Sequence, residues 1–401
     1  MPEGKHTIRP VRILPWDVGT DISKVQRGKI NLELKNLGWH HTSLESYCRD
    51  SNKLHYKYCK GYILTLDIFD DGFSIFCIHD PAKILNEISD FDPISINKEK
   101  TDSHCQLLSR QHFLSEIISM AQSSLWSLVP DKKRRSSASN KWENSGISYV
   151  FSVFLISTNS ASLRSKSLKP RCMALLFPMP ASEVSGSAEK DQAGTLEEHT
   201  SHEVNELLDQ STIVKSSYKK QYFSWATSIL AGPVNADVSL RYLRTMREIQ
   251  HAWFSAYIGN QLLSRTVEEL PNISKIETLI DLDSKMSKIG SEVAKYTSIP
   301  DSMATSTQLR SYRVAAAQSG LNDLAFSVDA KLQLIRNEIT SRIERRNVRG
   351  YRSLEMVLAL LTFIQAVSAY KTIESTGGLT IIELTIMSGT LIFLLIVLLF
   401  R

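Results

Sequence analysis

The last fifty residues contain two long apolar stretches, which constrain the fold more than any other part of the sequence. They run from Leu354 to Ile373 and from Leu379 to Phe400, separated by residues 374–378. Each stretch has roughly the 20 residues that a helix needs to cross a membrane. The sequence therefore predicts a C-terminal two-helix transmembrane hairpin with residues 374–378 as its outer loop. The alternative is a pair of buried helices in a soluble protein.

The charges beside these stretches predict an orientation. Lys371 and Glu374 are the charged residues of the short turn, where Gly377 and Gly378 can adopt the positive φ of a tight reversal. A membrane-proximal basic cluster precedes the first stretch: Arg342, Arg345, Arg346, Arg349 and Arg352. Because basic residues favour the cytoplasmic side, we expect a multi-pass protein of the cell (inner) membrane with both termini in the cytoplasm.

Composition narrows the classes of partner. A net charge of +5 is small for 401 residues, and the basic cluster supplies much of it, so nucleic acid is not an expected partner. Anionic membrane lipids are expected instead. The five cysteines include no Cys-x-x-Cys pair, so the sequence indicates neither a disulfide framework nor a zinc knuckle.

The first 180 residues read as an α+β or α/β cytoplasmic domain. A hairpin is predicted where Asp70, Asp71 and Gly72 join two runs rich in β-branched and aromatic residues. Residues 181–217 are rich in Ser, Glu, Gly and Thr, which predicts a flexible loop or insertion. The expected elements are strands at Thr7 to Leu14, Gly61 to Phe69, Phe73 to Ile78, Ile147 to Ser157 and Cys172 to Pro178, and a helix at His112 to Leu128.

From residue 218 to 307 we expect a final strand, Tyr222 to Ala231, and then two helices, Asp237 to Glu269 and Ser274 to Tyr296. Residues 308–353 are predicted to form a long stalk helix that continues into the first apolar stretch. Its apolar residues recur with an average spacing near 3.67, an eleven-residue repeat that lets long helices pack almost straight. We expect this stripe to pack both on the two preceding helices and on other copies of the chain, as a homo-oligomer.

Polar residues recur in the first apolar stretch, on one side of the expected helix. They are Glu355, Thr362, Gln365 and Ser368. Polar groups in a membrane helix face other helices or water, because lipid leaves them without hydrogen bonds. The stripe is therefore predicted either to line a pore or to join helices by hydrogen bonds.

This order of parts resembles the CorA-type divalent-cation channel superfamily. The resemblance is architectural and covers nearly the whole chain, although Ser368 to Thr372 stand where that family has a Gly-Met-Asn triplet. It implies a pentameric, CorA-like passive ion channel gated by its cytoplasmic domain, with Mg²⁺ or another divalent cation as the transported or regulatory ion. The alternative is a non-conducting, membrane-anchored sensor or membrane-perturbing effector whose soluble domain binds a ligand or partner.

Enzymatic function is not expected, because the sequence has no P-loop, no GxGxxG, no GxSxG elbow and no HExxH motif. His40 and His41 have no partner at metal-ligand spacing and are interpreted as ordinary loop residues. Asp67, Asp70 and Asp71, or Asp281 and Asp283, are interpreted either as regulatory cation sites or as solvated carboxylates. The sequence therefore predicts no catalytic residue and no definite metal ligand.

Overall fold

The computed structural model describes most of the chain. The described residues are 6–22, 24–42, 54–86, 112–130, 150–159, 163, 168, 172, 175–176, 212–215, 219–273, 275–297, 306–376 and 388–389. The chain divides into two compact units. Unit 1 comprises residues 1–265 and 287–331, and unit 2 comprises residues 266–286 and 332–401.

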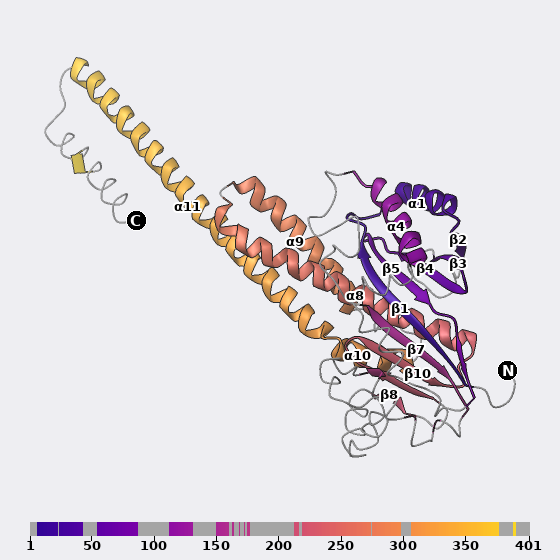
Figure 1. Ribbon diagram of the computed structural model, residues 1–401. Helices are drawn as coiled ribbons and strands as arrows, with labels where there is room; N and C mark the ends of the chain where they lie inside the picture. Colours follow the sequence, from indigo (N-terminus) through magenta and orange to yellow (C-terminus); the bar gives the residue numbers. More distant parts are fainter. Residues whose placement is uncertain are drawn as a thin grey trace, which may run out of the picture. The chain divides into compact units, whose positions relative to one another are not determined.

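Unit 1 is built on a ten-stranded mixed sheet (Figure 1). Nine strands follow the order β2-β3-β4-β5-β1-β7-β10-β9-β8, and β6 pairs with the start of β1 on the edge opposite β7. Among the described strands, β7 and β10 pair in parallel and the other pairs are antiparallel. The strands are β1 (His6–Asp17), β2 (His40–Thr42), β3 (Leu54–Cys59), β4 (Tyr62–Ile68), β5 (Phe73–His79), β6 (Lys83–Leu85), β7 (Phe151–Ser157), β8 (Thr212–Lys215), β9 (Lys220–Phe223) and β10 (Thr227–Gly232).

Two helices, α8 (Ala236–Glu269) and α10 (Ser306–Gln318), cover one face of the sheet, which we call the α8 face. Alternate residues of the central strands, such as Val11, Ile75 and Val153, are buried there against apolar residues of both helices. This cluster is the largest part of the core among the described residues.

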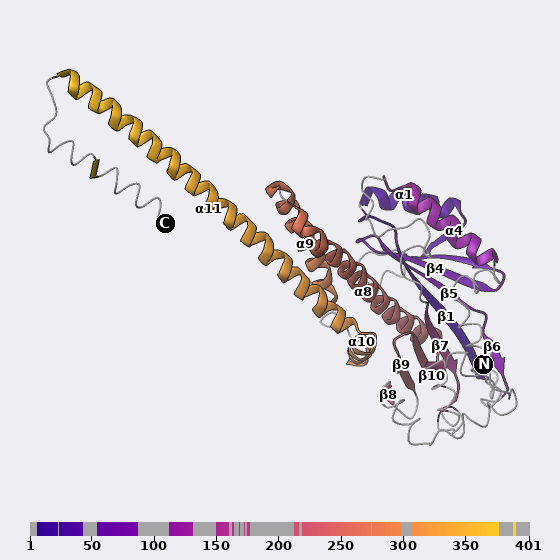
Figure 2. The ribbon, with the colours of Figure 1, turned by 60° about the vertical axis from the view of Figure 1, so that its left-hand side comes forward.

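The opposite face, called the α1 face, is covered in part by α1 (Lys24–Asn36) and α4 (His112–Ser127). Figure 2 shows these two helices side by side over the sheet near β4 and β5. Leu66 and Phe76 point to this face because successive strand residues alternate sides. Farther along the same face, Phe154 and Ile229 pack with residues from the 163–176 segment.

Unit 2 consists of the end of α8, the 3₁₀ helix η7 (Leu270–Asn272), the start of α9 (Ile276–Thr297) and most of α11 (Leu321–Thr376). Its buried residues include Leu279, Met286, Ile335 and Ile339. The stripe predicted to pack on preceding helices is therefore buried in this part of α11.

The long helix differs from the prediction at its start. The structure ends α10 at Gln318 and begins α11 at Leu321, with Gly320 between them at φ +69°. Gly has no Cβ and adopts this left-handed conformation readily. The right-handed helix is therefore interrupted at Gly320, and α11 begins as a separate helix. The helix itself is 56 residues long.

The predicted transmembrane hairpin is wrong for the described residues, none of whose helices is long and apolar enough to cross a membrane. The first predicted span, Leu354 to Ile373, lies within α11, and its side chains beyond Thr362 are outside the described part of the structure. The second span, 379–400, lies outside the described residues except at 388–389. The multi-pass membrane location and the orientation of the termini depended on this hairpin, and they are corrected with it.

Most predicted elements of unit 1 are confirmed, including the β4–β5 hairpin and helix α4. The segment from Tyr222 to Ala231 is not one strand but two, β9 and β10, which pair with each other through a turn at 224–226. The predicted strand from Cys172 to Pro178 is wrong, because Cys172, Leu175 and Leu176 are helical. The predicted flexible segment, 181–217, lies outside the described residues except for β8.

Candidate functional site

The β4–β5 hairpin carries three aspartates, each of which pairs with a basic side chain of the same chain. Asp67 Oδ2 lies 2.8 Å from Arg247 Nη1, and Asp71 Oδ2 lies 2.8 Å from His251 Nε2. Asp70 forms an ion pair with Arg27. Asp67 and Asp71 are largely buried rather than solvated. Basic side chains of the same chain therefore contact the three hairpin carboxylates that the sequence offered as a regulatory cation site.

The two partners on α8, Arg247 and His251, lie on one side of the helix because they are four residues apart. His251 also stacks on Phe69, with ring centroids 3.6 Å apart and planes 8° from parallel. Asp71 Oδ1 accepts a hydrogen bond from the Phe73 backbone N–H at 3.0 Å, which fixes the carboxylate in the turn. These contacts hold α8 against the β4–β5 hairpin, so the role of the three aspartates is structural.

Two neighbouring residues of β5 are held uncharged by their surroundings. Burial raises the pKa of the Cys77 thiol to about 12, so the thiolate that nucleophilic chemistry needs is not formed at neutral pH. Burial, reinforced by Arg247 and Arg9, lowers the pKa of His79 to about 3. Thr65 Oγ1 lies 3.5 Å from His79 Nε2. This arrangement supports no nucleophile activated by a base.

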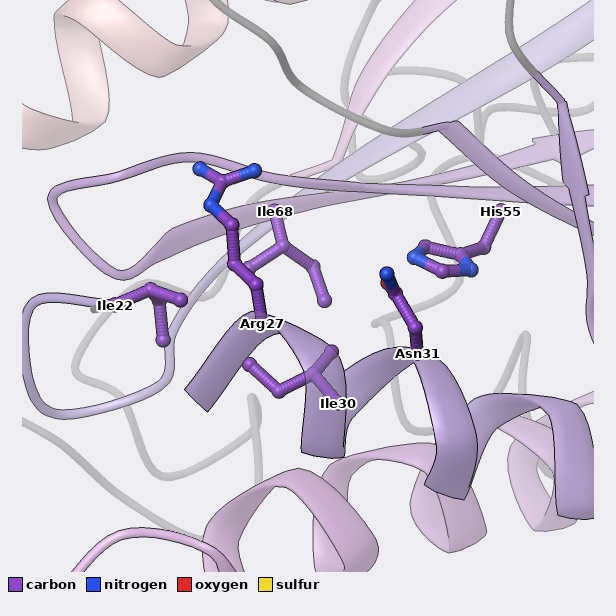
Figure 3. Close-up of a pocket in the computed structure, with 6 residues that line it drawn as sticks. All are labelled: Ile22, Arg27, Ile30, Asn31, His55 and Ile68. Atoms are coloured by element: carbon purple, nitrogen blue, oxygen red, sulfur yellow. The ribbon is translucent and has the colours of Figure 1, made fainter. Parts of the chain in front are cut away.

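A small pocket lies on the α1 face between α1, the loop before it, and strands β3 and β4 (Figure 3). It contains about 220 Å³ of empty space, part of which is open to solvent. Arg27 and Asn31 enter it from α1, and His55 enters it from β3. Its remaining wall is apolar and consists of Ile22, Ile30 and Ile68. Figure 3 shows the Asn31 and His55 side chains pointing toward one another.

The predicted pore-lining residues belong to α11. Glu355 and Thr362 are exposed, and Thr362 Oγ1 donates to the Leu358 carbonyl at 2.8 Å, inside its own helix. The Gln365 and Ser368 side chains lie outside the described part of the structure. The same is true of the side chains of Lys371 and Glu374, and of Gly377 and Gly378 altogether.

The predicted basic cluster is not one uniform surface. Arg342 is half-buried, and its guanidinium donates to the Leu270 carbonyl at 2.7 Å and the Ile273 carbonyl at 3.1 Å. It also pairs with Glu338 at 2.7 Å. Arg342 therefore donates to the backbone carbonyls of the first residue of η7 and of the residue that follows this helix. Arg345, Arg346 and Arg352 are exposed. The side chain of Arg349 lies outside the described part of the structure.

Beyond Arg342, α11 presents a long run of exposed apolar side chains, which we call the α11 surface. Its members are Val348, Tyr351, Leu354, Met356, Val357, Leu358, Leu360 and Leu361, each 49–67% exposed. Four of them, Tyr351, Leu354, Leu358 and Leu361, follow steps of three, four and three residues. That spacing places them on one side of the helix, as in the seam of a coiled coil.

No protein-family model, curated protein or solved structure matches this chain. The resemblance to the CorA-type superfamily therefore has no support beyond the order of parts that suggested it. Among the described residues, no group of three or more His, Cys, Asp or Glu side chains is arranged to hold a metal ion. The α11 surface and the pocket beside His55 are the features that function must be argued from.

Proposed function

We propose that this chain is a self-associating, non-enzymatic protein whose copies pair through the α11 surface. The mixed sheet of unit 1 is then a binding module. Self-association places two or more copies of this module in one oligomer. The observation that carries the proposal is the exposure of the apolar stripe at Tyr351, Leu354, Leu358 and Leu361. Contiguous exposed apolar surface of this kind marks an interaction site.

The length of the helix supports pairing with another helix. The 35 residues from Arg342 to Thr376 span roughly 50 Å at about 1.5 Å per residue. An isolated helix is only marginally stable in water, and most of its stability comes from packing an apolar face. A second copy of α11 supplies a face of matching period, because the stripe follows the heptad spacing by which helices interlock.

Charge favours an antiparallel pair. In a parallel pair, Arg345, Arg346 and Arg352 of one copy would lie beside the same arginines of the other, and like charges repel. An antiparallel two-fold pair separates the basic ends while keeping the apolar stripes together. Such a contact is self-complementary, as two-fold interfaces require.

The test is the mass of the full chain in solution, measured by sedimentation equilibrium over a range of concentrations. We expect the wild type to form an oligomer of defined mass. The triple variant Leu354→Glu, Leu358→Glu, Leu361→Glu places charges in the seam and is expected to be a monomer. Leu334→Glu is the matched control, because Leu334 is 52% exposed on the same helix, before the α11 surface begins.

Two results would contradict self-association. One is a triple variant with the same defined mass as the wild type. The other is a wild-type monomer that binds vesicles of anionic phospholipid through the same three leucines, which would make lipid the partner of the α11 surface. Ion conduction would require a membrane span that none of the described helices supplies, and so it does not form part of the proposal.

A further inference from the structure

A pair of histidines is brought together on the α1 face by the pairing of β2 with β3. His41 lies directly opposite His55 in the antiparallel register. Their ring centroids are 5.5 Å apart, and the planes meet at 66°. Side chains directly opposite each other on one face of a sheet are near enough to act on one ligand. Thirteen residues lie between His41 and His55 in the sequence, so their spacing did not indicate this pair.

The surroundings of the pair differ at its two ends. His55 is 3% exposed and is positioned by the packing around it, whereas His41 is exposed to solvent. The pocket of about 220 Å³ adjoins His55, and Asn31 faces the imidazole across it (Figure 3). An ion can therefore approach from the exposed His41 side.

We propose that His41 and His55 bind one divalent transition-metal ion such as Zn²⁺ or Ni²⁺. Imidazole nitrogen is a preferred ligand of these ions, whereas Mg²⁺ prefers oxygen ligands and keeps its waters. With Zn–N bonds of about 2.0–2.1 Å, two imidazoles on a tetrahedral ion place their ring centroids roughly 5 Å apart. The observed 5.5 Å is close to that separation, and in the proposed site water completes the coordination of the ion.

The neighbouring histidine provides an internal comparison. His40 precedes His41 on β2, so its side chain points to the opposite face of the sheet. Its ring lies 5.5 Å from that of Tyr56, which is a poor ligand for these ions at neutral pH. His40 is therefore also exposed and lies on the same strand as His41, but Tyr56 and not a histidine lies opposite it.

The test is calorimetric titration of the full chain, free of any polyhistidine tag, with Zn²⁺ and separately with Mg²⁺. We expect one Zn²⁺ site that His41→Asn and His55→Asn each weaken by about tenfold or more, since even outer-shell changes cost 10–100-fold. His40→Asn should bind as the wild type does, and Mg²⁺ should not compete. Cysteine thiols are common to all these proteins, so the difference between His41→Asn and the wild type reports this site alone.

Equal Zn²⁺ binding by the wild type and His41→Asn would overturn the proposal, as would a loss in His40→Asn as large as that in His41→Asn. His55 is buried, so His55→Asn can weaken binding by disturbing the fold. His41 is exposed, so its variant keeps the test decisive. The outcome is independent of the mass measurement that tests self-association.

Discussion

Arg247 and His251 show how single residues fix the arrangement of unit 1. They lie one turn apart on α8, and they pair with Asp67 and Asp71, which lie 180 residues earlier in the chain in each case. Removing one partner of such a pair leaves a largely buried group without its hydrogen bond. The free energy of unfolding then falls by more than the intact pair contributes to it. These contacts explain why the hairpin aspartates serve the fold rather than a cation.

His79 predicts how stability depends on pH. Its pKa in the folded protein is about 3, below the ordinary value of 6.5, so the unfolded chain binds the proton more readily between these values. The free energy of unfolding therefore falls as pH is lowered from about 6.5 toward 3, with a slope of at most about 1.4 kcal/mol per pH unit from this residue.

The variant His79→Gln should reduce that loss, because Gln stays neutral throughout. Denaturant unfolding at pH 7 and pH 4.5 measures the difference, and the gap between these two pH values should be smaller in His79→Gln than in the wild type. His112→Gln is the control, since His112 is 81% exposed. A gap unchanged by His79→Gln would show that His79 is not the group responsible.

At the scale of elements, Gly320 separates α10 from α11. A Cβ at this position meets nothing within 4 Å, so substitution is opposed by the backbone conformation and not by a clash. Gly350 also has open space, but it lies inside α11 and has ordinary helical φ. The two glycines therefore form a matched pair in which only φ differs.

We expect opposite effects from the same substitution at these two sites. Gly320→Ala should lower the free energy of unfolding by about 1–2 kcal/mol, the cost of left-handed backbone for a residue with a Cβ. Gly350→Ala should raise it by as much as about 1 kcal/mol, because Ala favours a helix over Gly. Urea titrations of both variants measure this, and a stabilised Gly320→Ala would mean that α10 and α11 join into one helix.

At the scale of the whole molecule, the buried and exposed stretches of α11 have different roles. Ile335 and Ile339 are buried within unit 2, whereas the apolar residues from Tyr351 onward are exposed. Self-association covers the second group, and partner binding stabilises a folded state by mass action. Assembly and thermal stability are therefore linked if copies pair through the α11 surface.

This linkage predicts a melting temperature that rises with protein concentration in the wild type. The triple variant Leu354→Glu, Leu358→Glu, Leu361→Glu should melt at one temperature at every concentration, because it has no partner to lose. Scanning calorimetry over a hundredfold range of concentration measures both. Concentration dependence of equal size in the triple variant would place the interface elsewhere on the chain.

Local pattern was enough to predict several elements. Asp70, Asp71 and Gly72 predicted the β4–β5 hairpin because a tight turn needs a residue at positive φ, and Gly72 has φ +80°. The spacing of apolar residues likewise predicted α4 and the buried stripe of α11. The hydropathy of residues 354–373 predicted a membrane span, whereas no helix among the described residues is long and apolar enough to be one.

The sequence by itself determined the periods of the strands and helices, since these depend on neighbouring residues. Only the tertiary structure decided which distant residues meet. His41 faces His55 through the register of β2 and β3, and Asp71 faces His251 through the position of α8. Both contacts depend on how sheet and helices pack, and packing is set by the whole core rather than by residues near in sequence.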